Sequence, residues 1–173
     1  MALYNDNPDY DDDDFDSEVD SQLDKYITFK IGAEDYAIEI RYVSEIIGIQ
    51  KISHIPYMPT YLKGIINLRA NVIPVIDVRL KFGYIEKSYN DRTSVLIINL
   101  NEATIGLIVD EVSEVLDIPA NQIDPPPIAG KQTKNRYIKG FGKVADTVII
   151  ILDISNILPE EEFNVILNAN IKL

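Results

Sequence analysis

Few side chains in this sequence could do chemistry. The 173 residues include one histidine, His54, and no cysteine, so a zinc site of the usual nitrogen and sulfur ligands cannot be assembled. A Ser-His-Asp arrangement would depend on His54 alone. This residue lies between apolar neighbours in the run 52–56, Ile-Ser-His-Ile-Pro, which favours a strand end with one ring nitrogen exposed.

Two aspartates, Asp77 and Asp153, recur at matching positions of an internal repeat. Such a carboxylate pair could support acid–base chemistry. Each one, however, closes an apolar strand, where Asp can hydrogen-bond the backbone of the next turn. The Gly140-Phe-Gly142 motif is interpreted as a bend in a strand, because it lacks the Gly-Lys-Ser/Thr ending of a phosphate loop. The sequence therefore predicts no enzyme, no cofactor and no metal site.

The repeat that contains these aspartates covers most of the chain. Residues 36–49 match residues 105–118, and the tripeptide Val-Ser-Glu is identical in both copies. A second match pairs Tyr61–Gly64 with Tyr137–Gly140. Two copies of this length are too few and too long for a solenoid. The duplication instead predicts two similar lobes with a groove between them.

Most of the remaining pattern consists of short strands. Residues 26–31 and 36–40 are rich in β-branched and aromatic residues and form a predicted hairpin around a turn at 32–35. Further strands are predicted at 65–69, 72–78, 94–100, 104–109, 138–144 and 148–154. Many short strands at close spacing indicate barrels or sandwiches. The predicted fold is mainly β, with two small barrels.

Three helices are also predicted. In the segment 42–47 the apolar residues Val43, Ile46 and Ile47 follow helical spacing, and the second copy repeats this pattern at 111–116. Residues 159–173 begin with Pro and three Glu, which suit the first turn of a helix. This last helix is expected to pack through Phe163, Ile166 and Leu167.

Charge separates the first 24 residues from the rest. They hold ten acidic residues and no Lys or Arg, within a net charge of −12 for the whole chain. Clustered like charges with little apolar surface predict a disordered tail, and the run lacks the Gly and Glu positions of a calcium-binding EF-hand loop. We therefore expect a tail at 1–24, a folded domain at 25–158, and a helix at 159–173. The domain comprises repeat halves at about 25–90 and 91–158, and strand exchange between the lobes is left open.

Location follows from what the sequence lacks. No signal-peptide pattern is found at the N-terminus and no apolar run reaches the roughly 20 residues that span a bilayer. Together with the absence of cysteine, this favours a cytoplasmic protein without direct membrane insertion.

One longer run is not required for building a barrel. Residues 61–83, Tyr-Leu-Lys-Gly-Ile-Ile-Asn-Leu-Arg-Ala-Asn-Val-Ile-Pro-Val-Ile-Asp-Val-Arg-Leu-Lys-Phe-Gly, resemble the signature of the CheW-type chemotaxis coupling proteins. The segments 35–46, 106–115, 123–126 and 137–140 match that family in the same order. Ala70 stands where the family usually has Gly, which indicates a different turn after Arg69.

The resemblance implies two five-stranded SH3-like barrels that share an extra core. It also implies a non-catalytic scaffold that couples methyl-accepting chemoreceptor tips to the regulatory domain of a CheA-type histidine kinase at membrane-associated receptor arrays. By their place in the motif, the residues lining the receptor groove would be Ile40, Val43, Glu45, Gly64, Arg69, Val112 and Val115. Residues that bind the kinase are not indicated. For the three valines, plain core packing is the alternative.

Other classes are left open by the sequence. A nucleic-acid-binding tandem β-barrel would use a basic groove with stacking aromatics. Ten tyrosines are present, but the acidic tail and the nearly neutral remainder argue against nucleic acid as a partner. The chain could also be the coupling half of a receiver-linked protein or a kinase's own regulatory domain, and its length opposes both.

Overall fold

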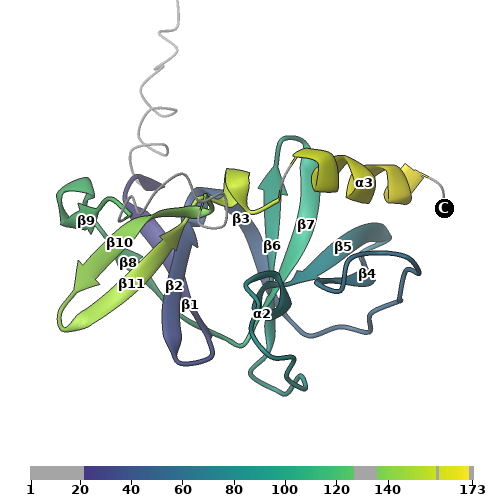
Figure 1. Ribbon diagram of the computed structural model, residues 1–173, viewed down its shortest axis with the longest axis horizontal. Coiled ribbons are helices and arrows are strands. Elements are labelled where there is room, and N and C mark those ends of the chain that lie inside the picture. Colours follow the sequence, from purple (N-terminus) through teal and green to yellow (C-terminus); the bar gives the residue numbers. More distant parts are fainter. Residues whose placement is uncertain (1–21, 127–135, 159, 172–173) are drawn as a thin grey trace, which may run out of the picture.

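The computed structural model describes residues 22–126, 136–158 and 160–171. The predicted acidic tail falls almost entirely outside these ranges. Two sheets carry the fold (Figure 1). We call the six-stranded sheet lobe 1 and the five-stranded sheet lobe 2. The predicted mainly β architecture of two SH3-like lobes is confirmed.

Lobe 1 has the strand order β8-β1-β2-β11-β10-β9. Its strands are β1 (Lys25–Ile31), β2 (Glu34–Glu39), β8 (Glu111–Asp117), β9 (Ile123–Asp124), β10 (Ile138–Val144) and β11 (Thr147–Leu152). Lobe 2 has the order β3-β6-β7-β5-β4. Its strands are β3 (Val43–Gly48), β4 (Leu62–Leu68), β5 (Asn71–Asp77), β6 (Ser94–Leu100) and β7 (Ala103–Val109).

The lobes do not follow the halves of the sequence. Strands β1 and β2 of the first half pair with β8 and β11 of the second, while β6 and β7 of the second half pair with β3 and β5 of the first. The two parallel contacts, β2 with β11 and β5 with β7, are the seams of this exchange. In the internal repeat, β8, β1, β2, β11 and β10 of lobe 1 correspond to β3, β6, β7, β5 and β4 of lobe 2. The two lobes therefore have the same order of five strands, and β9 is additional. Each half of the chain therefore contributes strands to both sheets, and neither half forms a complete sheet alone.

Short helical segments accompany the strands. They are the 3-10 turns η1 (Ile40–Tyr42), η2 (Ala120–Gln122) and η4 (Ile154–Asn156), and the helices α2 (Val78–Lys81) and α3 (Glu160–Ile171). The predicted C-terminal helix is present, but the side chains expected to anchor it lie outside the described residues. An ion pair joins Lys81 of α2 to Glu162 of α3, with 3.0 Å between Nζ and Oε2. Among the described residues, no helix is long and apolar enough to cross a membrane.

The helices predicted at 42–47 and 111–116 are wrong. These segments are strands β3 and β8, and only η1 precedes the first of them. In β3 the burial alternates from residue to residue, which is the period of a strand. A six-residue run that contains Val43, Ile46 and Ile47 fits helical spacing by chance, whereas its β-branched residues favour a strand. The pairing that decides the structure comes from the other half of the chain.

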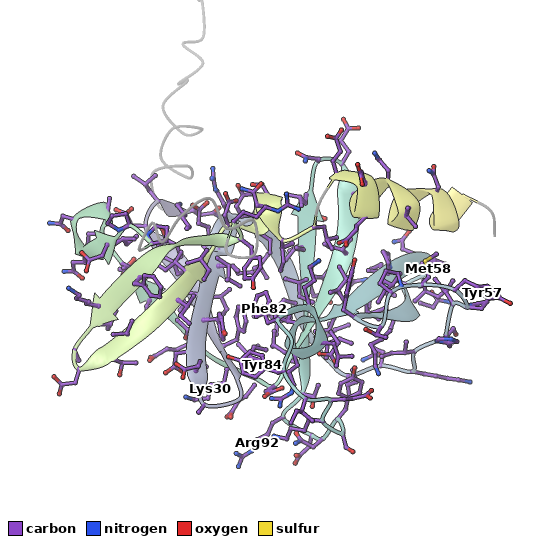
Figure 2. All side chains as sticks on the ribbon, viewed as in Figure 1. Lys30, Tyr57, Met58, Phe82, Tyr84 and Arg92 are labelled. Atoms are coloured by element: carbon purple, nitrogen blue, oxygen red, sulfur yellow. The ribbon has the colours of Figure 1, made fainter. Side chains whose placement is uncertain are left out.

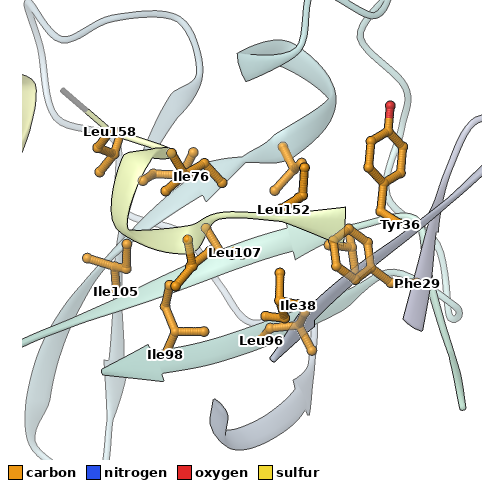
Figure 3. Close-up of a cluster of buried hydrophobic side chains, with 14 of the residues drawn as sticks. Phe29, Tyr36, Ile38, Ile76, Leu96, Ile98, Ile105, Leu107, Leu152 and Leu158 are labelled. Atoms are coloured by element: carbon orange, nitrogen blue, oxygen red, sulfur yellow. The ribbon is translucent and has the colours of Figure 1, made fainter. Parts of the chain in front are cut away.

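Both lobes share one apolar core. Phe29, Ile38 and Leu152 of lobe 1 pack with residues of lobe 2 in a single cluster (Figure 3). The lobe 2 members drawn and labelled in this cluster are Ile76, Leu96, Ile98, Ile105 and Leu107. Smaller clusters fill the rest of each lobe. Because burial of apolar area is the main stabilising term, the shared cluster makes the two lobes one folding unit.

The two repeat-related aspartates are structural. Asp77 is 1% exposed, and its carboxylate accepts hydrogen bonds from the Leu80 amide at 3.2 Å and the Tyr89 hydroxyl at 2.7 Å. Asp153 accepts from the Ser155 amide at 3.1 Å. Burial and the hydrogen bond to Asp77 raise the pKa of Tyr89. The predicted role of both residues, which is to bond the backbone of the next turn, is confirmed.

Asp77→Ala is expected to reduce the free energy of unfolding by about 2 kcal/mol, because it removes a helix cap and leaves the Tyr89 hydroxyl without its charged acceptor. Asp153→Ala is the matched variant and should cost about 1 kcal/mol, the usual value of a cap. Urea denaturation measures both. Equal losses would contradict this expectation, which rests on the burial of Asp77 and its bond to Tyr89.

Candidate functional site

The seven residues predicted to contact a receptor come from both lobes. Ile40 belongs to η1, Val43 and Glu45 to β3, Gly64 to β4, and Val112 and Val115 to β8, while Arg69 follows β4. Strands β3 and β8 are each at the edge of their sheet. We call these seven residues the candidate surface.

The three valines of the candidate surface differ in exposure. Val43 and Val112 are half-buried and pack against the cluster shared by both lobes. Val115 is 47% exposed, and Ile46, which holds the equivalent place on β3, is 45% exposed. The two edge strands thus present related apolar side chains to solvent. Such side chains could serve as anchors for an apolar partner.

Arg69 and Glu45 form an ion pair across lobe 2. Their side chains are 72% and 31% exposed, so the pair adds only roughly 0–1 kcal/mol to stability. Its position beside Val43 on β3 places a fixed charge pattern at the rim of the apolar residues. Rim charges of this kind set the register and specificity of a contact more than its affinity.

The turn after β4 differs from expectation. A different turn was expected because Ala70 replaces the usual Gly. Arg69 and Ala70 nevertheless have φ values of 49° and 66°, which is the left-handed conformation that Gly adopts without cost. Two successive left-handed residues between Leu68 and Asn71, which pair directly, make the tight two-residue turn typical of hairpins. Ala70 therefore takes the backbone that Gly would take.

Gly64 is buried beneath the chain's own backbone. Its φ is 145°, and a Cβ atom at this position would lie 2.0 Å from the carbonyl oxygen of Ser53. The repeat-related Gly140 lies in the same way beneath Asp124, whose carbonyl oxygen would be 2.6 Å from a Cβ. A missing side chain at such a position leaves room for the close approach of another backbone. The structure fills that space with residues 52 and 53.

Charged residues flank Ile40 at the lobe 1 end of the candidate surface. Glu39 accepts hydrogen bonds from Lys139 and from Arg41, and the Arg41 guanidinium lies 4.8 Å from the centre of the Tyr42 ring. Partial burial acts to raise the pKa of Glu39, but the bonds from Lys139 and Arg41 outweigh it and the net shift of the pKa is downward. Glu39 is therefore ionised at neutral pH, and the cluster presents both signs of charge.

Two features at the lobe boundary were not found by sequence reasoning. One is a cavity of about 290 Å³ lined by Tyr36, Phe82 and Tyr137 with their neighbours. The other is an ion pair between Arg79 and Asp110. Figure 2 shows Phe82 and Tyr84 between the two lobes, above Lys30. The residues that line this cavity come from distant parts of the sequence. Their aromatic side chains are the only signal that could have indicated it.

The described residues of the candidate surface and its neighbours form ion pairs, hydrogen bonds and apolar contacts. His54 is exposed, beside the bridge that Ser53 makes to Ile65. In the part of the chain that the structure describes, no group of three or more His, Cys, Asp or Glu residues could hold a metal ion. The arrangement defines a two-lobed β protein with a mixed apolar and charged surface across its lobe boundary.

Known proteins share this organisation. The model of the CheW-like domain matches residues 25–162. The chain is 35% identical to the chemotaxis protein CheW of Klebsiella aerogenes over 145 residues, which cover 84% of this chain and 87% of that protein. It is 34% identical to the Helicobacter pylori chemotaxis protein CheW, over 83% of this chain and 87% of the relative.

A solved structure agrees with the sequence matches. The scaffolding protein TtCheW from Thermoanaerobacter tengcongensis superposes with a TM-score of 0.72 at 34% identity, over 78% of this chain and 91% of that one. The chain belongs to the CheW-like family.

Proposed function

We propose that this chain is a non-catalytic adaptor that couples methyl-accepting chemoreceptor tips to the regulatory domain of a CheA-type histidine kinase. It would act in the cytoplasm, at membrane-associated receptor arrays. Family membership supports a role in chemotaxis, and the name of the structural relative supports a scaffold. The receptor assignment rests on the candidate surface, and the kinase assignment rests on the family resemblance alone.

One observation carries the receptor assignment. Two edge strands from different lobes, β3 and β8, present equivalent apolar side chains, and Glu45 of the Arg69–Glu45 pair lies on β3. An apolar helical partner gains affinity from anchors that lose water on binding, and rim charges fix its register. A helical receptor tip has that chemistry. The kinase regulatory domain is expected on a different face.

The nucleic-acid alternative gains no specific support. Bases stack on aromatic rings whose faces are open. Here Phe82 and Tyr137 stack on each other, with ring centres 4.8 Å apart, and Tyr36 lies 5.4 Å from Phe82. These three rings pack on one another within the protein and form no open platform, and Tyr57, which is exposed, is a single ring. We do not propose this function.

Arg69→Glu is expected to weaken receptor binding about tenfold, which corresponds to about 1.4 kcal/mol. The substitution places like charges beside Glu45 and reverses the rim charge that a partner would meet. Isothermal titration calorimetry against a purified receptor tip and, separately, a kinase regulatory domain provides the measurement.

Arg92→Glu is the matched control, because Arg92 is also an exposed arginine of lobe 2 but lies outside the candidate surface. It should leave both affinities unchanged. Arg69→Glu should retain kinase binding and the thermal midpoint of the wild type. An equal loss of both partners would show that Arg69 supports the fold and that the receptor surface is wrongly placed.

A further inference from the structure

One carboxylate is bonded to both lobes. Asp110 lies between β7 of lobe 2 and β8 of lobe 1. Its Oδ2 atom accepts a hydrogen bond from the Gly32 amide in the β1–β2 turn at 2.8 Å and another from Arg79 Nη1 at 2.5 Å. The Asp110 amide also donates to the Lys30 carbonyl at 3.1 Å. The side chain therefore joins the tip of a lobe 1 hairpin to the helix α2 of lobe 2.

The arginine of this pair is itself fixed in place. Arg79 Nε donates to the Ile85 carbonyl at 3.1 Å, and the guanidinium carbon lies 5.6 Å from the centre of the Tyr84 ring. The Tyr84 hydroxyl in turn lies 2.8 Å from the hydroxyl of Tyr36 on β2. The polar network thus crosses the lobe boundary twice, once at Asp110 and once at Tyr84.

This pair is more sheltered than the other ion pairs. The side chains of Arg79 and Asp110 are 14% and 16% exposed, and it is the only pair in the described ranges with both partners below 20%. A sheltered ion pair is weak evidence for stability, because the cost of removing two charges from water offsets their attraction. Its directional hydrogen bonds are better suited to fixing one arrangement.

The surroundings explain why the lobes need such a contact. The shared core is apolar, and apolar contacts are not directional. Next to the pair, the cavity of about 290 Å³ lies between Tyr36 and Ile150 of lobe 1 and Phe82 and Tyr84 of lobe 2. This cavity is open to solvent, so the side chains on this part of the boundary are packed less tightly than those of the core. A directional polar contact at this rim therefore adds a constraint that apolar packing does not supply.

We propose that the Asp110–Arg79 pair sets the position of the two lobes and thereby the spacing of the apolar residues on β3 and β8. Val112 follows Asp110 by two positions on lobe 1, and Val43 is its repeat-related counterpart on lobe 2. Asp110 and Arg79 are positioning residues, since neither belongs to the candidate surface. The consequence for receptor binding rests on the proposed function, whereas the positioning of the lobes does not.

The experiment measures the distance between the lobes directly. The chain has no cysteine, so Val72→Cys and Val148→Cys introduce the only two sites for spin labels. These residues are 45% and 54% exposed and occupy repeat-related places on β5 and β11. Double electron–electron resonance spectroscopy then gives the distribution of distances between the two labels, one on each lobe, in the folded protein.

Two variants break the pair in different ways. Asp110→Asn keeps an oxygen for the Gly32 amide and removes the charge that Arg79 meets, while Arg79→Met removes the cation. Asp35→Asn is the control, because Asp35 pairs with Lys30 at 2.9 Å within the hairpin of lobe 1. We expect both variants, but not the control, to shift the distance by about 1–2 Å or to broaden its distribution.

Receptor binding is measured on unlabelled proteins with a purified receptor tip. Asp110→Asn should lose affinity about fivefold, and Asp35→Asn should not. Distance distributions that match the wild type in both variants would overturn the proposal, as would an equal change in the control. If the wild type itself fails to bind the tip, the proposed function fails, and the distances still decide whether the pair positions the lobes.

Discussion

Gly64→Asp is expected to destabilise the whole protein by at least about 3 kcal/mol. A side chain here would begin 2.0 Å from the Ser53 carbonyl oxygen, and φ at this residue is 145°. The same Ser53 exchanges two backbone hydrogen bonds with Ile65, at 2.8 and 2.9 Å. Relieving the clash must therefore break this bridge as well as strain β4.

Thermal and urea denaturation measure the effect of Gly64→Asp. Gly48→Asp is the matched control, because Gly48 is exposed on β3 and a Cβ there would meet nothing within 4 Å. The control should retain nearly all of the wild-type stability. A Gly64→Asp protein that unfolds at the wild-type midpoint but no longer binds a receptor tip would show that this glycine serves the partner instead of the fold.

Val115→Asp is expected to weaken receptor binding about a hundredfold, or about 3 kcal/mol, without affecting the fold. Val115 is 47% exposed in the free protein, so a charge there is hydrated until a partner covers it. Burying that charge against an apolar helix leaves it unpaired, which is costly. Titration of a purified receptor tip measures the loss.

Val148→Asp controls for the change in charge. Val148 is similarly exposed, at 54%, but lies on β11 and outside the candidate surface. It should bind receptor and kinase as the wild type does. If the two variants bind the receptor tip equally well, β8 does not form part of the receptor surface.

The sequence predicted the two lobes and most of their strands, but it assigned two strands as helices. Duplication of the Val-Ser-Glu segment indicated two similar lobes, because equivalent sequences fold into equivalent units. The apolar spacing within these segments also suggested helices at 42–47 and 111–116, because a short apolar run fits both the helical and the strand period. What decides between them is the pairing of β3 with β6 and of β8 with β1. These contacts join opposite halves of the chain and leave no local signal.

The candidate surface shows the same division. Glu45 and Arg69, which the family motif assigns to the same groove, form an ion pair in lobe 2. The burial of Gly64 beneath Ser53 could not be foreseen, since it depends on the path of the loop between β3 and β4. The same holds for Asp110 and Arg79, whose shared position at the lobe boundary arises only from the exchange of strands. The assignment of receptor contacts itself stays a prediction.

Coupling requires that one molecule holds a receptor tip and a kinase regulatory domain at the same time. Sedimentation velocity on a mixture of the three purified components, each with its own absorbing label, measures this directly. The proposed function predicts a single boundary that carries all three labels, with kinase binding undisturbed as the receptor tip is added. Displacement of the kinase domain by the tip, or a boundary that never carries both partners, would contradict it.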